Sequence, residues 1–307
     1  MVSFALSGWR SPCFSSQKRR RLKQLVTLLL LGAAITLWFA PSASAVHDDV
    51  TVATDVTVAA AGDIAKCRSS AGDEETAALV QALDPDRVVT LGDNAYPDGT
   101  ISDFLGCYEP SWGVFKWKTA PAPGNHEYHT PKAAGYKEYF NLSDPWYAWD
   151  LNGWRFYSLN SEERIHKQAN WLRKDMQENP RDCYVAYWHR PRYSDGRHGD
   201  EPAMEPIWNT FASRGGDIVL AGHDHNYQRF SRIDNVRSFV VGTGGAGLTP
   251  IFGDRASVSN SDTHGVLLLT LRAGEYDWTF EPVAGGTFRE SRSGRLCTND
   301  GEKPRPT

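Results

Sequence analysis

Short apolar runs of strand length recur along most of the chain, and amphipathic helical patterns separate several of them. The helical patterns cover residues 74–83, 163–178 and 203–214. Strands that alternate with helices indicate an α/β architecture. The last strands follow one another without helices, so part of the sheet system is expected to be antiparallel. The strand-length runs cover residues 56–61, 87–91, 154–159, 184–188, 218–221, 239–241, 266–271 and 276–280.

Residues 1–45 follow a different pattern and predict a signal peptide. A basic cluster at residues 18–23 precedes an apolar stretch at residues 25–39, and Ala43-Ser44-Ala45 supplies a small-residue cleavage site before Val46. The apolar stretch is shorter than the roughly 20 residues that span a membrane, although a retained signal anchor is the alternative. Arg19-Arg20 also matches a twin-arginine signal, which is a weak motif within any basic cluster.

Removal of this leader makes the chain strongly acidic. The whole chain carries 33 Lys and Arg against 37 Asp and Glu, and residues 1–45 hold six of the basic residues and none of the acidic ones. The mature chain therefore has a net charge of −10, which argues against nucleic acid or an anionic membrane as a partner. Residues 46–300 suit one large domain, and the polar residues 301–307 are expected to form a disordered tail.

Four cysteines lie beyond the leader, and in an exported protein they indicate two disulfides with three possible pairings. Buried free thiols are the alternative, which an oxidising compartment disfavours. Because none of them has a Cys-x-x-Cys partner, a zinc knuckle is excluded. The four are Cys67, Cys107, Cys183 and Cys297.

Five short polar motifs carry the candidate chemistry, and most of them directly follow an apolar run. In open α/β sheets, ligands gather outside the carboxyl ends of strands, so the motifs can converge on one site. Their Asp, Asn, Tyr and His side chains suit iron, zinc or manganese. Each motif alone also fits an ordinary turn or helix cap, and only their order is specific. The motifs are Gly62-Asp63, Gly92-Asp93-Asn94-Ala95-Tyr96, Gly124-Asn125-His126-Glu127, His189 and Gly222-His223-Asp224-His225.

The order of these motifs resembles that of the calcineurin-like metallophosphoesterase superfamily, over about residues 56–285. Most members place a histidine two residues after the first aspartate, and here that position is Ala65. Purple acid phosphatases lack this histidine and have a tyrosine three residues after the second aspartate, which here is Tyr96. The chain therefore resembles that branch, in a short form without an N-terminal accessory domain. The resemblance implies a four-layer α/β/β/α sandwich of two mixed sheets flanked by helices.

The resemblance also implies a phosphatase that hydrolyses phosphate monoesters at a dinuclear metal centre. Two cations about 3.5–4 Å apart clamp the phosphoryl oxygens, and a metal-bound hydroxide attacks phosphorus in line. His126 is then the general acid that protonates the leaving group. The resemblance further implies that Asp93 bridges the metals. It implies that a ferric ion is held by Asp63, Tyr96 and His225, and that an Fe(II), Zn(II) or Mn(II) ion is held by Asn125, His189 and His223.

Several residues outside the ligand set have weaker indications. His198 lies in a polar loop, where contact with substrate and an ordinary surface position are both open. The glycine-rich residues 242–247 satisfy G-x-G-x-x-G, but Pro250 prevents the helix that a dinucleotide site needs, so a tight loop beneath the metals is expected. Tyr108, Trp112 and Tyr193 are candidates for the mouth of the site, whereas His47, His129, His166 and His264 have no motif around them.

The pairing of the cysteines is predicted from their distance along the chain to the motifs. Cys67 lies four residues after Asp63 and Cys107 lies eleven after Tyr96, so both belong to loops above the same metal. This predicts Cys67–Cys107 and leaves Cys183–Cys297 as the second bridge.

Two other functions stay open at this point. The same site can act on diesters, pyrophosphates or nucleotides, because substrate choice depends on loops. A non-catalytic extracellular binding protein on the same fold is the third hypothesis, although such a protein has no need of the acid at His126. We expect a small phosphorylated substrate, no stable membrane insertion after signal removal, and a secreted, periplasmic or cell-surface location.

Overall fold

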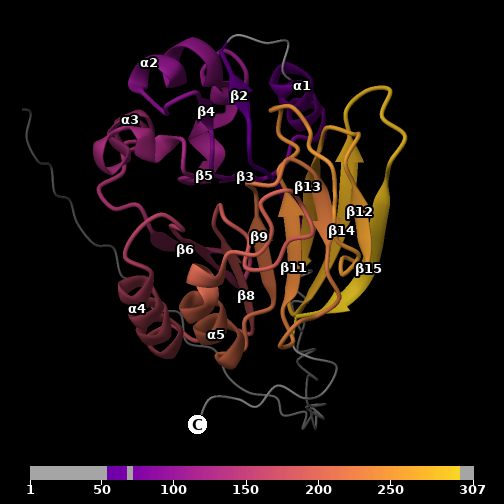
Figure 1. Cartoon of the computed structure of the whole chain (residues 1–307). Helices are drawn as coiled ribbons and strands as arrows, with labels where there is room; N and C mark the ends of the chain where they lie inside the picture. The colour runs from indigo at the N-terminus through magenta and orange to yellow at the C-terminus, as the bar shows by residue number, and fades with distance from the viewer. Residues whose placement is uncertain (1–53, 68–71, 298–307) are drawn as a thin grey trace, which may run out of the picture. The chain divides into compact units, whose positions relative to one another are not determined.

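The computed structural model describes residues 54–67 and 72–297, which build two large β-sheets with helices packed against them (Figure 1). The predicted leader, its cleavage site and the tail at residues 301–307 lie outside the described residues. Within the described part of the chain, no helix has the length and apolar character needed to cross a bilayer.

The first sheet has the strand order β15-β14-β13-β1-β3-β5. β1, β3 and β5 run parallel to one another, and β13 joins β1 in antiparallel pairing. The carboxyl ends of three neighbouring strands therefore lie at one edge of this sheet. Its strands are β1 (Val56–Ala61), β3 (Arg87–Leu91), β5 (Thr119–Ala122), β13 (Gly265–Arg272), β14 (Glu275–Pro282) and β15 (Glu290–Leu296).

The second sheet has the strand order β12-β10-β11-β9-β8-β7-β6, and its four middle strands are parallel. A separate two-stranded pair joins β2 (Ala65–Lys66) to β4 (Ala95–Tyr96). The strands of the second sheet are β6 (Tyr147–Leu151), β7 (Trp154–Ser158), β8 (Cys183–Tyr187), β9 (Ile218–Ala221), β10 (Tyr227–Arg229), β11 (Arg237–Val241) and β12 (Val258–Asn260).

Helices pack against both sheets, and this arrangement of two mixed sheets with helices confirms the predicted sandwich. α1 buries Ala77 and Val80 in the larger apolar core, which joins residues of both sheets. α4 and α5 pack together on the second sheet through side chains such as Leu172 and Phe211. The α-helices are α1 (Asp73–Leu83), α2 (Ile101–Asp103), α3 (Ala134–Phe140), α4 (Ile165–Glu178) and α5 (Glu205–Ser213). Other helical turns lie at Phe104–Tyr108, Trp112–Lys118, Glu127–His129, Pro131–Ala133 and Pro202–Met204.

β8 shows why the middle strands read as unbroken apolar runs. Val185 and Tyr187 face the core between the sheets, whereas Tyr184 and Ala186 face α4 and α5. Successive side chains of a strand point to opposite faces, so a strand covered on both sides needs apolar residues at every position. A continuous apolar run in the sequence therefore predicts a strand of this kind.

The prediction missed β5, among other short or polar strands, and joined a short turn and α5 into one helix. β5 contains Pro121, which removes a backbone donor, but β5 is the edge strand of its sheet and needs ladder bonds on one side alone. The helix expected over residues 203–214 is a short turn at Pro202–Met204 followed by α5. Pro206 lies in the first turn of α5, where a missing backbone donor is tolerated.

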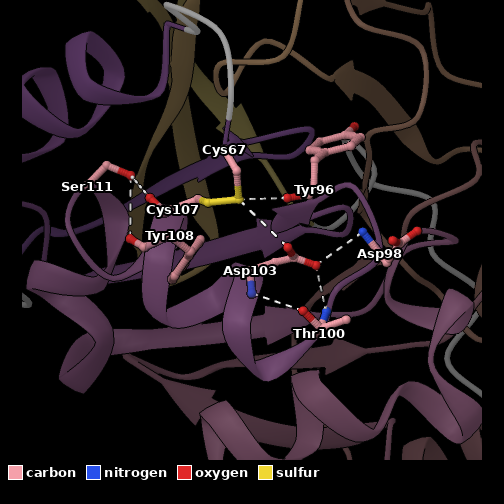
Figure 2. Close-up of a disulfide and its surroundings, with 8 residues drawn as sticks. All are labelled: Cys67, Tyr96, Asp98, Thr100, Asp103, Cys107, Tyr108 and Ser111. Carbon is pink, nitrogen blue, oxygen red and sulfur yellow. Dashed lines mark hydrogen bonds between the residues drawn. A yellow bond between two sulfur atoms is a disulfide. The ribbon is translucent and has the colours of Figure 1, made fainter.

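Both predicted disulfides are present. Cys67 and Cys107 are joined with their Cα atoms 5.0 Å apart, and Cys183 and Cys297 are joined at 5.4 Å. The second bridge is buried, with Cys183 and Cys297 at most 1 % exposed. The first bridge lies near the surface beside β4, and Cys67 Sγ is 3.0 Å from the carbonyl oxygen of Tyr96 (Figure 2).

Candidate metal centre

The carboxyl ends of strands from both sheets meet and bring all seven predicted ligands together. Asp63 follows β1, Asp93 follows β3 and His223 follows β9. These three residues have φ angles of 59°, 49° and 71°, a region that side-chain-bearing residues rarely adopt. Each such residue costs about 1–3 kcal/mol, and strain of this kind concentrates at functional sites.

The first half of the site is built around the hydroxyl group of Tyr96. This oxygen lies 3.2 Å from Asp63 Oδ1, 3.2 Å from Asp93 Oδ2 and 3.3 Å from His225 Nε2. His225 Nε2 is itself 3.3 Å from Asp63 Oδ1. One phenolic proton therefore faces three acceptors and can satisfy only one of them fully.

The second half is built around His189 Nε2. This nitrogen lies 3.2 Å from Asp93 Oδ2, 3.1 Å from Asn125 Oδ1 and 3.1 Å from His223 Nδ1. Ligand atoms of Asp93, His189 and His223 all fall within 4.8 Å of one another. Asp93 Oδ2 is thus common to both halves, which is the position that the sequence predicted for a bridging ligand.

Bonds outside the cluster aim the ligand atoms inward. The Nδ1 atoms of His189 and His225 each donate to a backbone carbonyl, of Leu91 and of Gly247, at 2.8 Å. Each ring therefore presents Nε2 to the site, as metal-binding histidines commonly do. Asp63 Oδ2 accepts from the amide of His223 at 2.8 Å, which leaves Oδ1 of this carboxylate for the cluster.

These residues fit a pair of cations. Carboxylate, phenol, amide and imidazole groups all direct lone pairs into the cluster. They carry too few protons for every pair of these atoms to form a hydrogen bond, whereas bound cations would interact with all of these lone pairs at once. Burial alone would lower the pKa of His189, but the Asp93 carboxylate raises it to about 10. Burial, reinforced by Asp93 and Asp63, raises the pKa of Tyr96 well above its usual value. Protons on His189 and Tyr96 thus hold positions that cations can take over.

Two glycines are required by close approach at the centre. A Cβ added to Gly92 would lie 2.6 Å from the His189 side chain, and Gly92 has a φ of +85°. A Cβ added to Gly124 would lie 2.3 Å from Asp93 Oδ1. Substitution of either glycine would push a candidate ligand out of place.

Glu127 is a supporting residue whose role the sequence did not indicate. Its side chain is fully buried. Its carboxylate accepts from the amides of Asp93, Asn94 and Gly124 at 3.0, 2.9 and 2.7 Å, and from the amide of Ala95 at 3.3 Å. It therefore joins the loop after β3 to the loop after β5. Its place directly after Gly124-Asn125-His126 is the signal that could have found it.

The two predicted catalytic histidines lie on the open side of the cluster. His126 donates from Nδ1 to the Pro97 carbonyl, and its Nε2 lies 3.7 Å from Asp93 Oδ2 with 29 % of the side chain exposed. The exposed His198 ring packs 4.2 Å from the ring of His223. The His198 ring thus lies against a candidate ligand, and its contact with substrate stays a prediction.

Other expectations had mixed outcomes. The glycine-rich loop does pack beneath the site, since the amide of Ala246 donates to the Asp63 carbonyl at 2.7 Å. The expectation that Tyr108 and Trp112 line the mouth is wrong, because both are fully buried in the aromatic core. Tyr193 packs edge-on against Trp208, with ring centres 4.9 Å apart.

His129, which no motif marked, lies beside His126. The two ring centres are 4.8 Å apart, and His129 Nδ1 pairs with Asp98 Oδ1 at 2.9 Å.

The chain is similar in sequence to known acid phosphatases. Purple acid phosphatase 15 of Arabidopsis thaliana is 28% identical over 213 residues, covering 52% of this chain and 40% of that protein. Acid phosphatase type 7 of Homo sapiens is 26% identical over 190 residues, covering 50% of this chain and 43% of that protein. The chain thus spans less than half the length of these two relatives.

Solved structures share the fold. The purple acid phosphatase PPD1 from yellow lupin seeds superposes with a TM-score of 0.62 at 21% identity, covering 78% of this chain and 53% of that one. GAP50, described as the anchor in the inner membrane complex of Plasmodium, superposes with a TM-score of 0.65 at 15% identity, covering 82% of this chain and 90% of that one. The calcineurin-like phosphoesterase model matches residues 56–227. The chain therefore belongs to the calcineurin-like phosphoesterase family, and the relatives it matches include purple acid phosphatases.

Proposed function

We propose that the protein is an exported phosphatase that hydrolyses phosphate monoesters at a dinuclear metal centre. This proposal rests on one observation. The two groups of candidate ligand atoms share Asp93 Oδ2, and His126 lies beside the same oxygen. Family membership supports phosphoester chemistry in general. The monoester preference and the identity of the metals are our inference.

The two halves of the site suit different ions. Asp63, Tyr96 and His225 offer a carboxylate, a phenol and an imidazole, a set that favours Fe(III) once the phenol ionises. The second half is the neutral set Asn125, His189 and His223, which favours Fe(II), Zn(II) or Mn(II). When bound, such a pair of ions supplies Lewis acidity toward the phosphoryl oxygens and activates water.

His126 has the position of a proton donor to the leaving group. The Pro97 carbonyl fixes the proton of Nδ1, so Nε2 is the atom that faces the cluster. Partial exposure of the ring leaves room for a substrate oxygen to approach Nε2. To act as a donor the ring must be an imidazolium with a second proton on Nε2, and we infer that this Nε2 proton passes to the ester oxygen as its bond to phosphorus breaks, which leaves the neutral ring with its proton on Nδ1.

Two alternatives use the same residues. A diesterase, pyrophosphatase or nucleotidase needs the same metal ligands, and loops would set its preference. A binding protein on this fold is the other alternative, and the description of GAP50 as an anchor gives it a precedent in a protein of similar structure. The placement of His126 at the cluster supports catalysis over binding.

Export is supported by two features. Residues 1–45 have the pattern of a signal peptide, and the two disulfides need an oxidising compartment. We therefore infer a secreted, periplasmic or cell-surface location.

A substrate panel with metal analysis tests the proposal. We expect p-nitrophenyl phosphate to be hydrolysed faster than bis(p-nitrophenyl) phosphate and nucleotides by protein that carries two metal ions per chain. Faster hydrolysis of the diester or of nucleotides would support the first alternative. No hydrolysis of any ester by fully metal-loaded protein would support the binding protein.

A further inference from the structure

The loop that carries His198 across the candidate metal centre is held at both ends. We call residues 193–200 the His198 loop. The His198 ring reaches His223, with ring centres 4.2 Å apart, although His198 belongs to no secondary-structure element. An exposed ring on a loop keeps one position only where the loop backbone is fixed. The contacts of the His198 loop therefore decide where the ring lies.

On its inner side the His198 loop is fixed by buried polar side chains. Asp224, which is fully buried between two candidate ligands, accepts from the His198 amide at 2.8 Å and from Ser194 Oγ at 2.5 Å. Gln228 accepts from the Asp195 amide at 2.7 Å. The loop backbone is thus tied to the strand region that supplies His223.

On its outer side one arginine holds both ends of the loop. Arg255 donates from Nε to Asp195 Oδ1 at 2.7 Å and from Nη2 to the Ser194 carbonyl at 2.6 Å. It also donates to both oxygens of Asp200, at 2.8 and 2.9 Å. Asp195 and Asp200 are both acidic, so without the guanidinium group they would repel each other. Arg255 is half exposed and belongs to none of the motifs.

We propose that Arg255 is a positioning residue that holds His198 over the metal centre, where the His198 ring contacts the phosphoryl group of the substrate. This inference rests on the proposed phosphatase function. The hydrogen bonds of Arg255 go to Ser194, Asp195 and Asp200 and to none of the candidate ligands, so it acts through the His198 loop. A planar, multiply bonded guanidinium suits this task, and lysine cannot replace its geometry.

A double-mutant cycle tests the coupling. We expect Arg255→Gln to lower kcat/KM for p-nitrophenyl phosphate by about 10–100-fold with unchanged metal content, because a displacement of about 1 Å in a positioning group can cost about 10²-fold. His198→Ala should lose a similar factor, and the double variant should lose no more than His198→Ala alone. Losses that multiply in the double variant, or no loss in Arg255→Gln, would overturn the proposal.

Arg272 offers a matched control. It too is a surface arginine bonded to two aspartates, Asp55 and Asp277, but it lies at the end of β13 that pairs with the start of β1, away from the metal centre. Arg272→Gln should leave kcat/KM within about twofold, as surface substitutions usually do. A loss equal to that of Arg255→Gln would show a general effect of surface ion pairs and contradict the proposal.

Hydrogen exchange separates this inference from the proposed function. In the wild type, the amides of Ser194, Asp195 and His198 are bonded and should exchange slowly. Arg255→Gln should speed exchange over residues 193–200 and leave β8 unchanged. Unchanged exchange in this variant would refute the inference whatever the activity. Faster exchange in a protein that hydrolyses no ester would refute the proposed function instead, and with it the role of His198.

Discussion

The two halves of the candidate metal centre share one carboxylate and both include imidazoles, but only the first half adds donors that can carry a negative charge. Tyr96 brings a phenol to the first half, together with the Asp63 carboxylate. The second half has the amide oxygen of Asn125 and two imidazoles around His189 Nε2. Asp93 Oδ2 lies 3.2 Å from the central atom of each half. The first half can therefore carry two negative charges of its own, and the second carries none.

This difference indicates how the two halves of one site can each bind a different ion. Burial and the carboxylates raise the pKa of the Tyr96 phenol, so it stays protonated until a cation strong enough to ionise it binds. A trivalent ion meets that requirement better than a divalent one. Burial and the neighbouring His189 lower the pKa of His223 to about 2, so this imidazole is neutral and ready to bind a metal. The asymmetry suits a mixed-valence or mixed-metal pair.

Removal of the Asp93 carboxylate should prevent metal binding in both halves of the centre. We expect Asp93→Ala to lose both metals and to lower turnover by about 10⁴-fold or more, as when a group on which a whole catalytic unit depends is removed. His223→Ala should lose the second metal and retain most of the first. Metal analysis of both variants by mass spectrometry checks this. Retention of both ions by Asp93→Ala would contradict the assignment of Asp93 as the bridge.

Removal of the proton donor should leave both halves intact. We expect His126→Ala to keep both metals and to slow turnover by about 10²–10⁴-fold, the usual contribution of a general acid. The loss should be larger for alkyl phosphates than for p-nitrophenyl phosphate, whose leaving group needs little protonation. Kinetics with both esters and metal analysis measure this. Metal loss in this variant would mean that His126 is a ligand.

The two disulfides should affect the two halves differently. Loss of either bridge should destabilise the fold by about 2–4 kcal/mol, with the larger cost for Cys183–Cys297, which closes 114 residues against 40. Cys67–Cys107 lies against the backbone of Tyr96, so its double serine variant should also bind the first metal more weakly. Thermal melts and iron titrations compare the variants. Equal iron affinity in the double serine variants of the two bridges would contradict the proposed link between the surface bridge and Tyr96.

Sequence predicted the parts of the site that follow strands and missed those held by distant contacts. Asp63 and Asp93 stand next to glycines after apolar runs, and Ala65 together with Tyr96 gave the resemblance to purple acid phosphatases. Glu127 accepts hydrogen bonds from amides more than thirty residues away in the sequence. Arg255 forms an ion pair with Asp195, which is sixty residues away. Such contacts depend on the folded sheets, and neither residue lies in a periodic pattern.

The fold shows the same division. Strands buried on both faces, such as β8, have a continuous apolar pattern that predicts them. The edge strand β5 is short and contains Pro121, so only its pairing with β3 reveals it. The exposed strand β15 is largely polar and was missed for a similar reason, because it pairs with β14 alone.

The visible spectrum of iron-loaded protein tests the asymmetry of the two halves most directly. A phenolate bound to a ferric ion absorbs visible light by charge transfer, whereas amide and imidazole donors do not give that band. We predict that the wild type is pink to purple and that Tyr96→Phe, at equal iron content, is colourless and binds iron more weakly. An iron-loaded wild type without a visible band, or a Tyr96→Phe variant that keeps one, would contradict the assignment of Tyr96 as a ligand and with it the account of two unlike halves.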